Sequence, residues 1–322
     1  MKVLLVTPKY FPTISGNTVT VHRIKHKIEE LGIKTKVITG KNLTKKIIKE
    51  YYPDIIHAFH ARKSNIHNII SELKIPYVVT LTGTDINVDI HDKKLRELIK
   101  NVIENADYVT AFEKHSLLEL KKHKIHPKIT KIIPQGKSLW KKSNYDLREN
   151  FSLDKSVYII LLPAGIRDIK DILYAIKEIE LLKIQKKALI ILGEIVDKGY
   201  YKEIRDYITQ KNITWVRFGK ISHENMCEAY RTADLIINTS VSEGMSTVLT
   251  EAKEINVPIL AADIPGNRFL PEKYLFPKKN RALAKAIEKA YKKNKKTKSK
   301  ECKREKDNEG IEYVKIYKRI FK

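Results

Sequence analysis

Short runs of apolar, mostly β-branched residues alternate with longer amphipathic stretches along the whole 322-residue chain. The runs are continuous rather than alternating with polar residues, which is typical of strands buried on both faces of a parallel sheet. The stretch 92–105 is typical of a covering helix, because Leu95, Leu98, Ile99, Val102 and Ile103 share one face. We predict strands at 3–7, 35–39, 54–59, 77–81, 107–112, 129–134, 157–163, 188–193, 213–219, 234–240, 257–262 and 274–276.

The pattern of strands and helices stops after the sixth run and then restarts. The polar stretch near residues 138–155 separates the two series and is predicted to be a linker. The chain is therefore predicted to be an α/β protein with two Rossmann-like domains, at 1–145 and 155–305, followed by a docking terminal helix at 306–322. Ligands of such sheets bind outside the carboxyl ends of the strands, so we expect the site in a cleft between the domains.

The charge balance favours an anionic partner. Lysine and arginine number 63 against 38 acidic residues, a formal net charge of +25. The lysine-rich run 289–306 has Tyr291 as its one aromatic residue, so stacking platforms for nucleic acid are missing, and no nucleic-acid-binding motif is present. We interpret the run as a solvated helix, with attachment to an anionic membrane surface as the second interpretation.

Several classes of protein are disfavoured. The apolar run near the start ends at Pro8 and is too short for a signal peptide, and no window is apolar enough to span a membrane. We therefore expect a cytoplasmic protein, with peripheral membrane attachment as an alternative. Cys227 and Cys302 are far apart, which argues against a disulfide framework, and His22 and His26 lack a third ligand. No metal site is expected.

The segment from Asp234 to Asn267 carries the most chemical information. A strand leads into a polar loop at 239–245, and a helix is expected from about 246 to 255, ended by Asn256 in a left-handed conformation. Glu243 lies in the loop and Glu251 inside the helix, so both carboxylates are expected to face one site. Backbone N–H groups at the helix start suit a phosphate, and the carboxylates suit sugar hydroxyls. Spacing alone leaves open that these residues only cap and solvate a helix.

The same segment resembles the E-x7-E signature of the family-4 glycosyltransferases, which have the GT-B fold. The resemblance is carried by SEGMSTVLTEAKEINVPILAADIPGN, by PKYFPTISGNTVTVHRIKHKIEELGIKTKVI near the start, and by PDIIHAFHA, YVVTLTGTD, ADYVTAFEKHSLLEL and IIPQG in the same order. In the second half it is carried by PAGIRDIKDILYAI, LIILGE and FGKISHENMCEAYRTADLIINTS. The chain is most similar to the branch of the glycosyltransferase-1-domain-containing proteins.

The resemblance implies retaining transfer of a hexose from a nucleoside-diphosphate sugar to an acceptor hydroxyl, without a metal or other cofactor. The acceptor is a sugar, a lipid-linked molecule or a small molecule. The implied donor-site residues are Glu251 for the ribose, Glu243 for the transferred sugar, Gly244, Met245, Ser246 and Thr247 for sugar and diphosphate, Arg167 and Lys170 for the leaving diphosphate, and Gly16 and Asn17 for the same phosphates.

Three departures from the family pattern affect these assignments. Thr82 precedes Gly83 where the family often has histidine, so Asp85 is kept only as an acceptor-side candidate. Asp171 follows Lys170 where the family has glycine, which makes Lys170 a weaker candidate than Arg167. Asn17 replaces a second glycine, and asparagine tolerates the left-handed backbone that such a turn needs.

His57 and His60, at the end of the third predicted strand, are expected to face the cleft. They are further acceptor-side candidates because a histidine can act on an acceptor hydroxyl. Ordinary hydrogen bonds at a strand end are the favoured interpretation of the pair. Three alternatives stay open at this point. One is a nucleotide-sugar epimerase on the same fold, and another is a basic protein that binds nucleic acid or an anionic surface. The third, left open by the missing histidine before Gly83, is a degenerate family member that binds the donor but transfers slowly.

Overall fold

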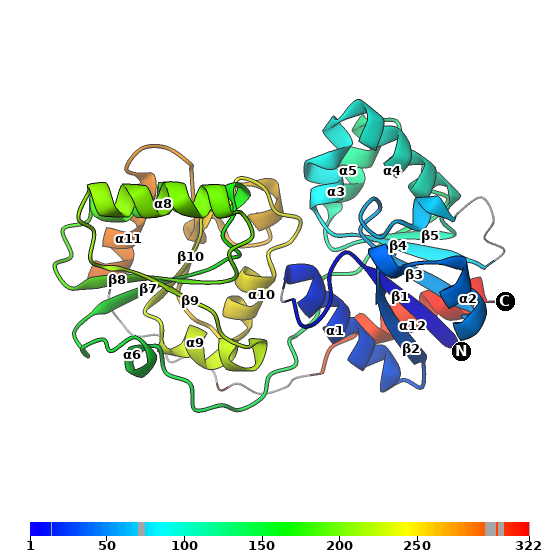
Figure 1. The fold of residues 1–322 in the computed structure, drawn as a ribbon, viewed down its shortest axis with the longest axis horizontal. Coiled ribbons are helices and arrows are strands. Elements are labelled where there is room, and N and C mark those ends of the chain that lie inside the picture. Colours follow the sequence, from blue (N-terminus) through cyan, green and yellow to red (C-terminus); the bar gives the residue numbers. More distant parts are fainter. Residues whose placement is uncertain (14, 70–74, 294–300, 302–305, 322) are drawn as a thin grey trace. The chain divides into compact units, whose positions relative to one another are not determined.

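The computed structural model describes residues 1–322 except 14, 70–74, 294–300, 302–305 and 322 (Figure 1). Two compact units make up the chain. The first consists of Met1–Gly136, Ser242–Thr247 and Lys306–Lys322, and the second of Lys137–Val241 and Val248–Glu305. The short segment Ser242–Thr247 therefore belongs to the first unit, although the chain on both sides of it belongs to the second.

The described residues of the first unit form a six-stranded parallel sheet in the order β2-β1-β3-β4-β5-β6. A strand lies in each of the six runs that the sequence predicts here. The strands are β1 (Lys2–Thr7), β2 (Lys34–Thr39), β3 (Ile55–Phe59), β4 (Tyr77–Leu81), β5 (Tyr108–Ala111) and β6 (Thr130–Ile132). The helices are α1 (Gly16–Glu29), α2 (Lys45–Tyr51), α3 (Thr84–Asn87), α4 (Lys93–Asn105), α5 (Lys114–Lys122) and α12 (Glu309–Ile320), with 3-10 turns η1 (Gly40–Asn42), η2 (Ile66–Asn68) and η4 (Asp89–His91).

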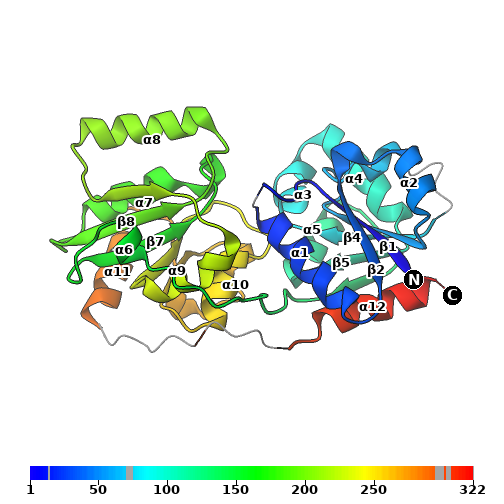
Figure 2. The same cartoon turned by 60° about the horizontal axis from the view of Figure 1, so that its bottom comes forward.

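Helices cover both faces of this sheet, as the apolar strands require. In β1, Leu4 and Val6 belong to a core cluster that also holds side chains of α2, α4 and α5. Val3 and Leu5 point to the opposite face and belong to a cluster with side chains of α1 and α12. Figure 2 shows α12 alongside α1 on that face. The last helix of the chain is thus part of the first core.

The described residues of the second unit form another six-stranded parallel sheet, in the order β12-β11-β10-β7-β8-β9. Each of the other six predicted runs contains a strand. The strands are β7 (Tyr158–Pro163), β8 (Lys187–Leu192), β9 (Val216–Gly219), β10 (Leu235–Asn238), β11 (Ile259–Ala262) and β12 (Leu275–Phe276). The helices are α6 (Leu147–Asn150), α7 (Ile172–Glu180), α8 (Lys198–Gln210), α9 (Met226–Thr232), α10 (Thr247–Glu254) and α11 (Ala282–Lys292), with 3-10 turns η5 (Asp168–Lys170), η6 (His223–Asn225), η7 (Pro265–Asn267) and η8 (Glu272–Tyr274).

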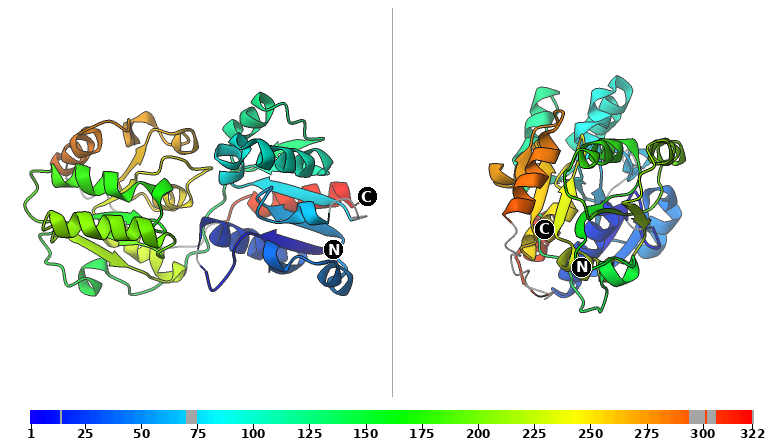
Figure 3. Two further views of the ribbon diagram at one scale, coloured as in Figure 1. Left: turned by 45° about the horizontal axis from the view of Figure 1, so that its top comes forward. Right: turned by 90° about the vertical axis from the view of Figure 1, so that its left-hand side faces the viewer.

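The second sheet is also buried on both faces. Alternate residues of β7 belong to a core cluster with side chains of α7, α8 and α11 on one face and to a cluster with side chains of α6, α9 and α10 on the other. These layers can be followed in Figure 3. Cys227 of α9 is fully buried in the second of these cores. It is disulfide-bonded, a link that the wide spacing of the two cysteines did not lead us to expect.

The order of strands reverses at one point in each sheet. In the second sheet the reversal lies between β7 and β10, which are paired neighbours. Loops at the carboxyl ends of strands at such a point form the usual ligand site of open α/β sheets. The loop after β7 carries Arg167 and Lys170, and the loop after β10 leads to Glu243, so the sequence candidates lie where this topology favours a site.

A buried ion pair anchors the terminal helix. Arg23 of α1 donates two hydrogen bonds to Glu309, from Nε at 2.8 Å and from Nη2 at 2.9 Å, and both side chains are at most 2% exposed. Lys27 also contacts Glu309, at 3.1 Å, and pairs with Asp307. Burial by itself raises the pKa of the Glu309 carboxyl, but the charges of Arg23 and Lys27 hold it below its ordinary value.

Two observations concern surface attachment. Most of the lysine-rich run predicted at 289–306 falls on 294–300 and 302–305, outside the described residues. Within the described part of the chain, no helix has the length and apolar character needed to cross a membrane.

Candidate functional site

The loop between β10 and α10 has the form that the sequence predicts. The chain leaves β10 at Asn238, and α10 runs from Thr247 to Glu254. Asn256 follows with a φ of 59°, the left-handed conformation expected of it. Glu243 therefore lies in the loop, and Glu251 lies within the helix.

Side chains of the first unit hold the segment Ser242–Thr247 by its backbone. The Asn87 side chain donates to the carbonyl oxygen of Glu243 at 2.6 Å, and Gln135 Nε2 donates to that of Met245 at 2.7 Å. The Thr247 hydroxyl donates to Gln135 Oε1 at 3.3 Å. Neither Asn87 nor Gln135 was identified from the sequence, because a single amide that binds a backbone carbonyl leaves no pattern of spacing.

Two glycines in the first unit approach each other closely. A Cβ atom on Gly83 would lie 2.5 Å from the backbone nitrogen of Gly244, and a Cβ on Gly244 would lie 2.7 Å from Gly83 Cα. Gly83 also has a φ of 117°, a conformation that side-chain-bearing residues rarely adopt. The absence of a side chain at both positions is what permits this contact between the loop after β4 and the loop before α10.

The start of α1 lies near the same segment. Ser15 caps α1 by accepting the N–H of Thr18 at 3.1 Å, and a Cβ atom on Gly16 would lie 3.7 Å from Thr247 Oγ1. The structure thus brings Gly16 together with Thr247. Asn17 lies in the first turn of α1 and is not among the residues with positive φ, so the expected left-handed turn is wrong. The helix already begins at Gly16, and Asn17 continues it.

Glu251 lies in a buried polar cluster of the second unit. Its Oε1 accepts from His223 Nε2 at 2.9 Å and from the Ser138 hydroxyl at 3.3 Å, and its Oε2 accepts from the Tyr230 hydroxyl at 2.8 Å. Burial and the charge of Glu251 raise the pKa of Tyr230 well above its ordinary value, so the phenol stays a donor. Glu254, whose pKa is raised chiefly by burial, accepts the N–H of Ser138 at 3.0 Å.

The basic pair lies on the 3-10 turn that follows β7. Thr239, just after β10, donates from its hydroxyl to the Lys170 carbonyl at 2.9 Å, and the N–H of Val241 donates to the Ile169 carbonyl at 3.0 Å. The turn carrying Arg167 and Lys170 is therefore hydrogen-bonded to the strand end that leads toward Glu243. Asp171 adopts a φ of 45°, which explains why an aspartate can stand where the family has glycine.

Lys278 is a neighbouring cation that the sequence analysis missed. Its Nζ donates to the Thr239 carbonyl at 2.8 Å and pairs with the carboxylate of Asp171. It comes from the segment after β12, about a hundred residues along the chain from Asp171. No local spacing could have linked it to the basic pair.

Asp85 is fully buried, and both of its oxygens accept backbone hydrogen bonds. Oδ1 accepts the N–H of Gly83 at 2.8 Å, and Oδ2 accepts that of Ala61 at 3.0 Å. The N–H of Thr82 lies 3.2 Å from Oδ1. These bonds brace the loop that holds Gly83. A role for Asp85 toward an acceptor stays a prediction.

His57 differs from the expectation that it faces a cleft. It lies within β3, is fully buried, and bonds through Nδ1 to the Tyr317 hydroxyl at 2.6 Å and through Nε2 to the Thr80 hydroxyl at 2.7 Å. Its side chain points toward α12, because alternate residues of a strand face opposite sides of the sheet. Burial lowers the pKa of His57 to about 3, so the ring is neutral at ordinary pH.

His60 is also buried, at the turn that follows β3. Its Nδ1 accepts the N–H groups of Lys63 at 3.1 Å and Arg62 at 3.3 Å, so the ring proton is assigned to Nε2, which donates to the Thr84 hydroxyl at 2.9 Å. Burial lowers the pKa of His60. These ordinary hydrogen bonds match the favoured interpretation of the pair, and an action of His60 on an acceptor stays a prediction.

The buried His57 makes the stability of the protein depend on pH. Because its pKa is about 3 when folded and 6.5 ordinarily, the unfolded chain binds the extra proton between these values. The stability is complete above pH 6.5 and falls as the pH approaches 3, with a loss of about 2–3 kcal/mol by pH 4.5. Denaturant unfolding of wild type and His57→Gln between pH 7.5 and 4.5 measures this pH dependence. The unfolding free energy of the variant should fall by about 2–3 kcal/mol less than that of wild type. Equal losses in the two proteins would contradict the assignment of this pH dependence to His57.

The candidates divide between the two units. The first unit holds Gly16, Asn17, His57, His60, Asp85, Glu243, Gly244, Met245, Ser246 and Thr247, and the second holds Arg167, Lys170 and Glu251. Their roles toward a ligand remain predictions.

Models of known families match most of the chain. The model described as "Glycosyl transferases group 1" matches residues 144–308, and the model described as "Glycosyl transferase 4-like" matches residues 1–113. Glycosyltransferase 1 domain-containing protein 1 of Xenopus tropicalis is 28% identical over 277 residues, which are 79% of this chain and 76% of that protein. The putative teichuronic acid biosynthesis glycosyltransferase TuaC of Bacillus subtilis is 30% identical over 251 residues, which are 74% of this chain and 61% of that protein.

Solved structures support the fold. Sucrose-phosphate synthase from Thermosynechococcus elongatus aligns with a TM-score of 0.77 at 17% identity, covering 99% of this chain and 94% of that one. Anabaena HepE in complex with UDP-glucose aligns with a TM-score of 0.74 at 19% identity, covering 100% of this chain and 95% of that one. At such identities the likeness concerns the fold alone, and it confirms the predicted GT-B class.

Proposed function

The chain belongs to the glycosyl transferases of group 1, and we propose that it moves a hexose from a nucleoside-diphosphate sugar to an acceptor hydroxyl with retention of configuration. The transfer proceeds without a metal or other cofactor. The observation that carries the proposal is the hydrogen-bonded contact between the turn bearing Arg167 and Lys170 and the strand end that leads to Glu243. Cations beside the carboxyl end of β10 are what a departing diphosphate needs.

The chemistry follows from the charge of the leaving group. A nucleoside diphosphate gains negative charge as the bond to the sugar breaks, and fixed cations at that position stabilise the transition state more than the ground state. Arg167 offers a planar guanidinium that binds two phosphate oxygens at once, and Lys170 acts as a compact charge. The N–H groups at the start of α10 add further donors for the phosphates.

Glu251 is the proposed ribose ligand. Each carboxylate oxygen can accept two hydrogen bonds, and Oε2 of Glu251 accepts one from the Tyr230 hydroxyl. The bond from Ser138 to Oε1 is the longest of the three, at 3.3 Å, and a ribose hydroxyl is expected to replace it. Glu243 then contacts the hydroxyls of the transferred sugar.

Donor binding tests the proposal. Thermal unfolding of wild type with UDP, GDP, ADP and their sugar conjugates should show a higher Tm with one nucleotide, because a ligand of the folded state stabilises it. Arg167→Ala should weaken that nucleotide 10- to 100-fold, since a charge-assisted bond contributes about 1.5–3 kcal/mol. Arg205→Ala, on the exposed side of α8, is the matched control and should bind like wild type. If wild type, Arg167→Ala and Arg205→Ala bind the nucleotide equally tightly, Arg167 does not contact the donor.

Retention and metal independence need a second measurement. Proton NMR of the product within the first minutes, before mutarotation, should show the anomer of the donor, and an excess of EDTA should leave the rate unchanged. An inverted product would reject the retaining proposal. Conversion of the donor with no acceptor consumed would instead support an epimerase.

A further inference from the structure

A cluster of metal-ligand side chains lies on the first unit and includes none of the residues assigned above. Among the residues that the structure describes, one group of three combines two histidines and a glutamate, His91, Glu119 and His123. One ligand atom from each lies within 4.8 Å of the other two. The two imidazole rings have centroids 5.3 Å apart. We propose that these three residues bind a divalent transition-metal ion of the zinc class.

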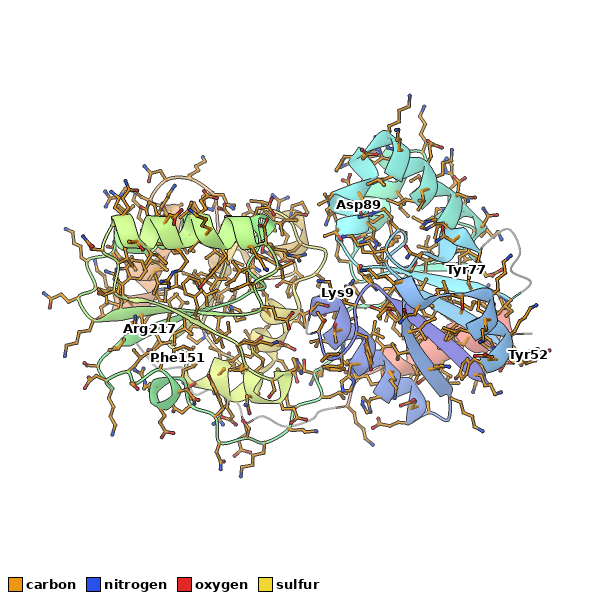
Figure 4. The ribbon with its side chains drawn as sticks, viewed as in Figure 1. Lys9, Tyr52, Tyr77, Asp89, Phe151 and Arg217 are labelled. Carbon is orange, nitrogen blue, oxygen red and sulfur yellow. The ribbon has the colours of Figure 1, made fainter. Side chains whose placement is uncertain are left out.

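Two elements bring the ligands together. Glu119 lies on α5, and His123, four residues later, is the C-cap residue that follows α5, so both lie on one face of the helix. His91 is the last residue of η4, the 3-10 turn that joins α3 to α4. The start of η4 at Asp89 is labelled in Figure 4, and Figure 1 shows α3, α4 and α5 grouped together. The site therefore joins segments about thirty residues apart in the chain.

The ligand types decide the class of metal. Imidazole nitrogen suits zinc, nickel, copper and cobalt, and one carboxylate beside two imidazoles is a known zinc donor set that leaves a position for water. Calcium and magnesium prefer all-oxygen sites, which these residues do not provide. Zinc–ligand bonds of about 2.0–2.2 Å require donor atoms to lie closer than 4.8 Å. His91 is exposed, so rotation of its side chain can supply the movement.

Neighbouring cations set the affinity. Lys122 Nζ lies 2.5 Å from Glu119 Oε1, and its side chain is 65% exposed, so it can swing into solvent when a metal arrives. Arg96 is held by the carbonyl oxygens of Ile90 and His91, and it stays near the site. Repulsion from these charges favours a Kd on the order of 10 μM rather than nanomolar binding.

A bound metal would fasten η4 to α5. The segment from α3 to η4 begins beside Gly83 and contains Asn87, which holds the backbone of Glu243. The metal would therefore restrain one end of a segment whose other end supports the loop 242–247. The inference does not rest on the proposed transfer reaction, because metal binding is measured without a nucleotide sugar.

The test uses the full chain, freed of metal by dialysis against a chelator, and titrates it with ZnCl2 in a calorimeter. Wild type should bind about one equivalent with a Kd on the order of 10 μM, and zinc should raise its Tm. His91→Ala and His123→Ala should each weaken binding at least tenfold. His126→Ala removes an exposed imidazole three residues after His123 in the chain and should bind like wild type. Cobalt absorption in the visible range reports nitrogen and oxygen ligation independently of the calorimeter.

Two results would overturn the proposal. One is zinc binding by wild type no tighter than about 1 mM. The other is zinc binding that persists in His91→Ala and His123→Ala but is lost in His26→Ala. That result would assign the metal to the α1 pair His22 and His26, whose rings lie 4.4 Å apart. Circular dichroism of each variant separates a lost ligand from a lost fold.

Discussion

Replacing Glu309 by alanine should lower the free energy of unfolding by about 3–5 kcal/mol, because it leaves the Arg23 guanidinium buried without a counter-charge. Both side chains are almost completely enclosed, and two hydrogen bonds join them. A buried charge cannot recover its lost hydration unless a partner replaces it. Denaturant unfolding of wild type and variant at pH 7.5 measures the difference.

Two matched variants define the origin of this effect. Asp206→Ala breaks an exposed pair with Lys202 on α8, where both side chains are more than 60% exposed, and should cost less than about 1 kcal/mol. The double variant Arg23→Met/Glu309→Leu removes both charges and should recover most of the stability lost in Glu309→Ala. If Glu309→Ala loses no more stability than Asp206→Ala, the pair of Arg23 and Glu309 does not anchor α12.

The packing of α12 on the rest of the first unit shows where sequence reasoning reaches its limit. The spacing of Ile316, Tyr317 and Ile320 predicts an amphipathic helix that docks, because an apolar face must be covered. The spacing carries no information about the partner. Arg23, nearly three hundred residues away, and His57, inside a strand, meet this helix only through the folded chain.

The strands were predictable for a different reason. Each is a continuous apolar run between helices, and burial on both faces selects that composition locally. The loop after β10 was predictable as well, because asparagine, glycine and serine favour loops and caps. The neighbours of Glu251 were not. Ser138, His223 and Tyr230 come from three separate segments, and each makes one hydrogen bond that leaves no periodic signal.

His57 and Asn17 show how a local rule can mislead. A histidine near a strand end looks accessible in the sequence, but the side to which it points depends on the register of β3 with β4. Asn17 was expected in a left-handed turn because it stands where the family has a second glycine. Because Ser15 caps α1, the helix begins at Gly16, one residue before Asn17. Asn17 is therefore helical, and no left-handed turn forms there.

Replacing Gly83 by alanine should lower the rate of glycosyl transfer on the order of 100-fold while the protein stays folded. The new Cβ would lie 2.5 Å from the backbone nitrogen of Gly244, so the segment carrying Glu243 must move. The loop around Gly83 cannot easily move instead, because Asp85 accepts its N–H and that of Thr82. A displacement of about 1 Å at the reacting groups is enough for a loss of this size.

Gly32→Ala separates this displacement from backbone strain. Gly32 has a φ of 83°, similarly unfavourable for alanine, but a Cβ there would meet no atom within 4 Å. Both variants should lose about 1–2 kcal/mol of stability from the strained backbone, and only Gly83→Ala should lose transfer activity. Gly244→Ala, which creates the same contact from the other side without a positive φ, should lose activity with less strain. If Gly83→Ala transfers sugar as fast as Gly32→Ala, the close approach of the two loops does not position Glu243 for the reaction.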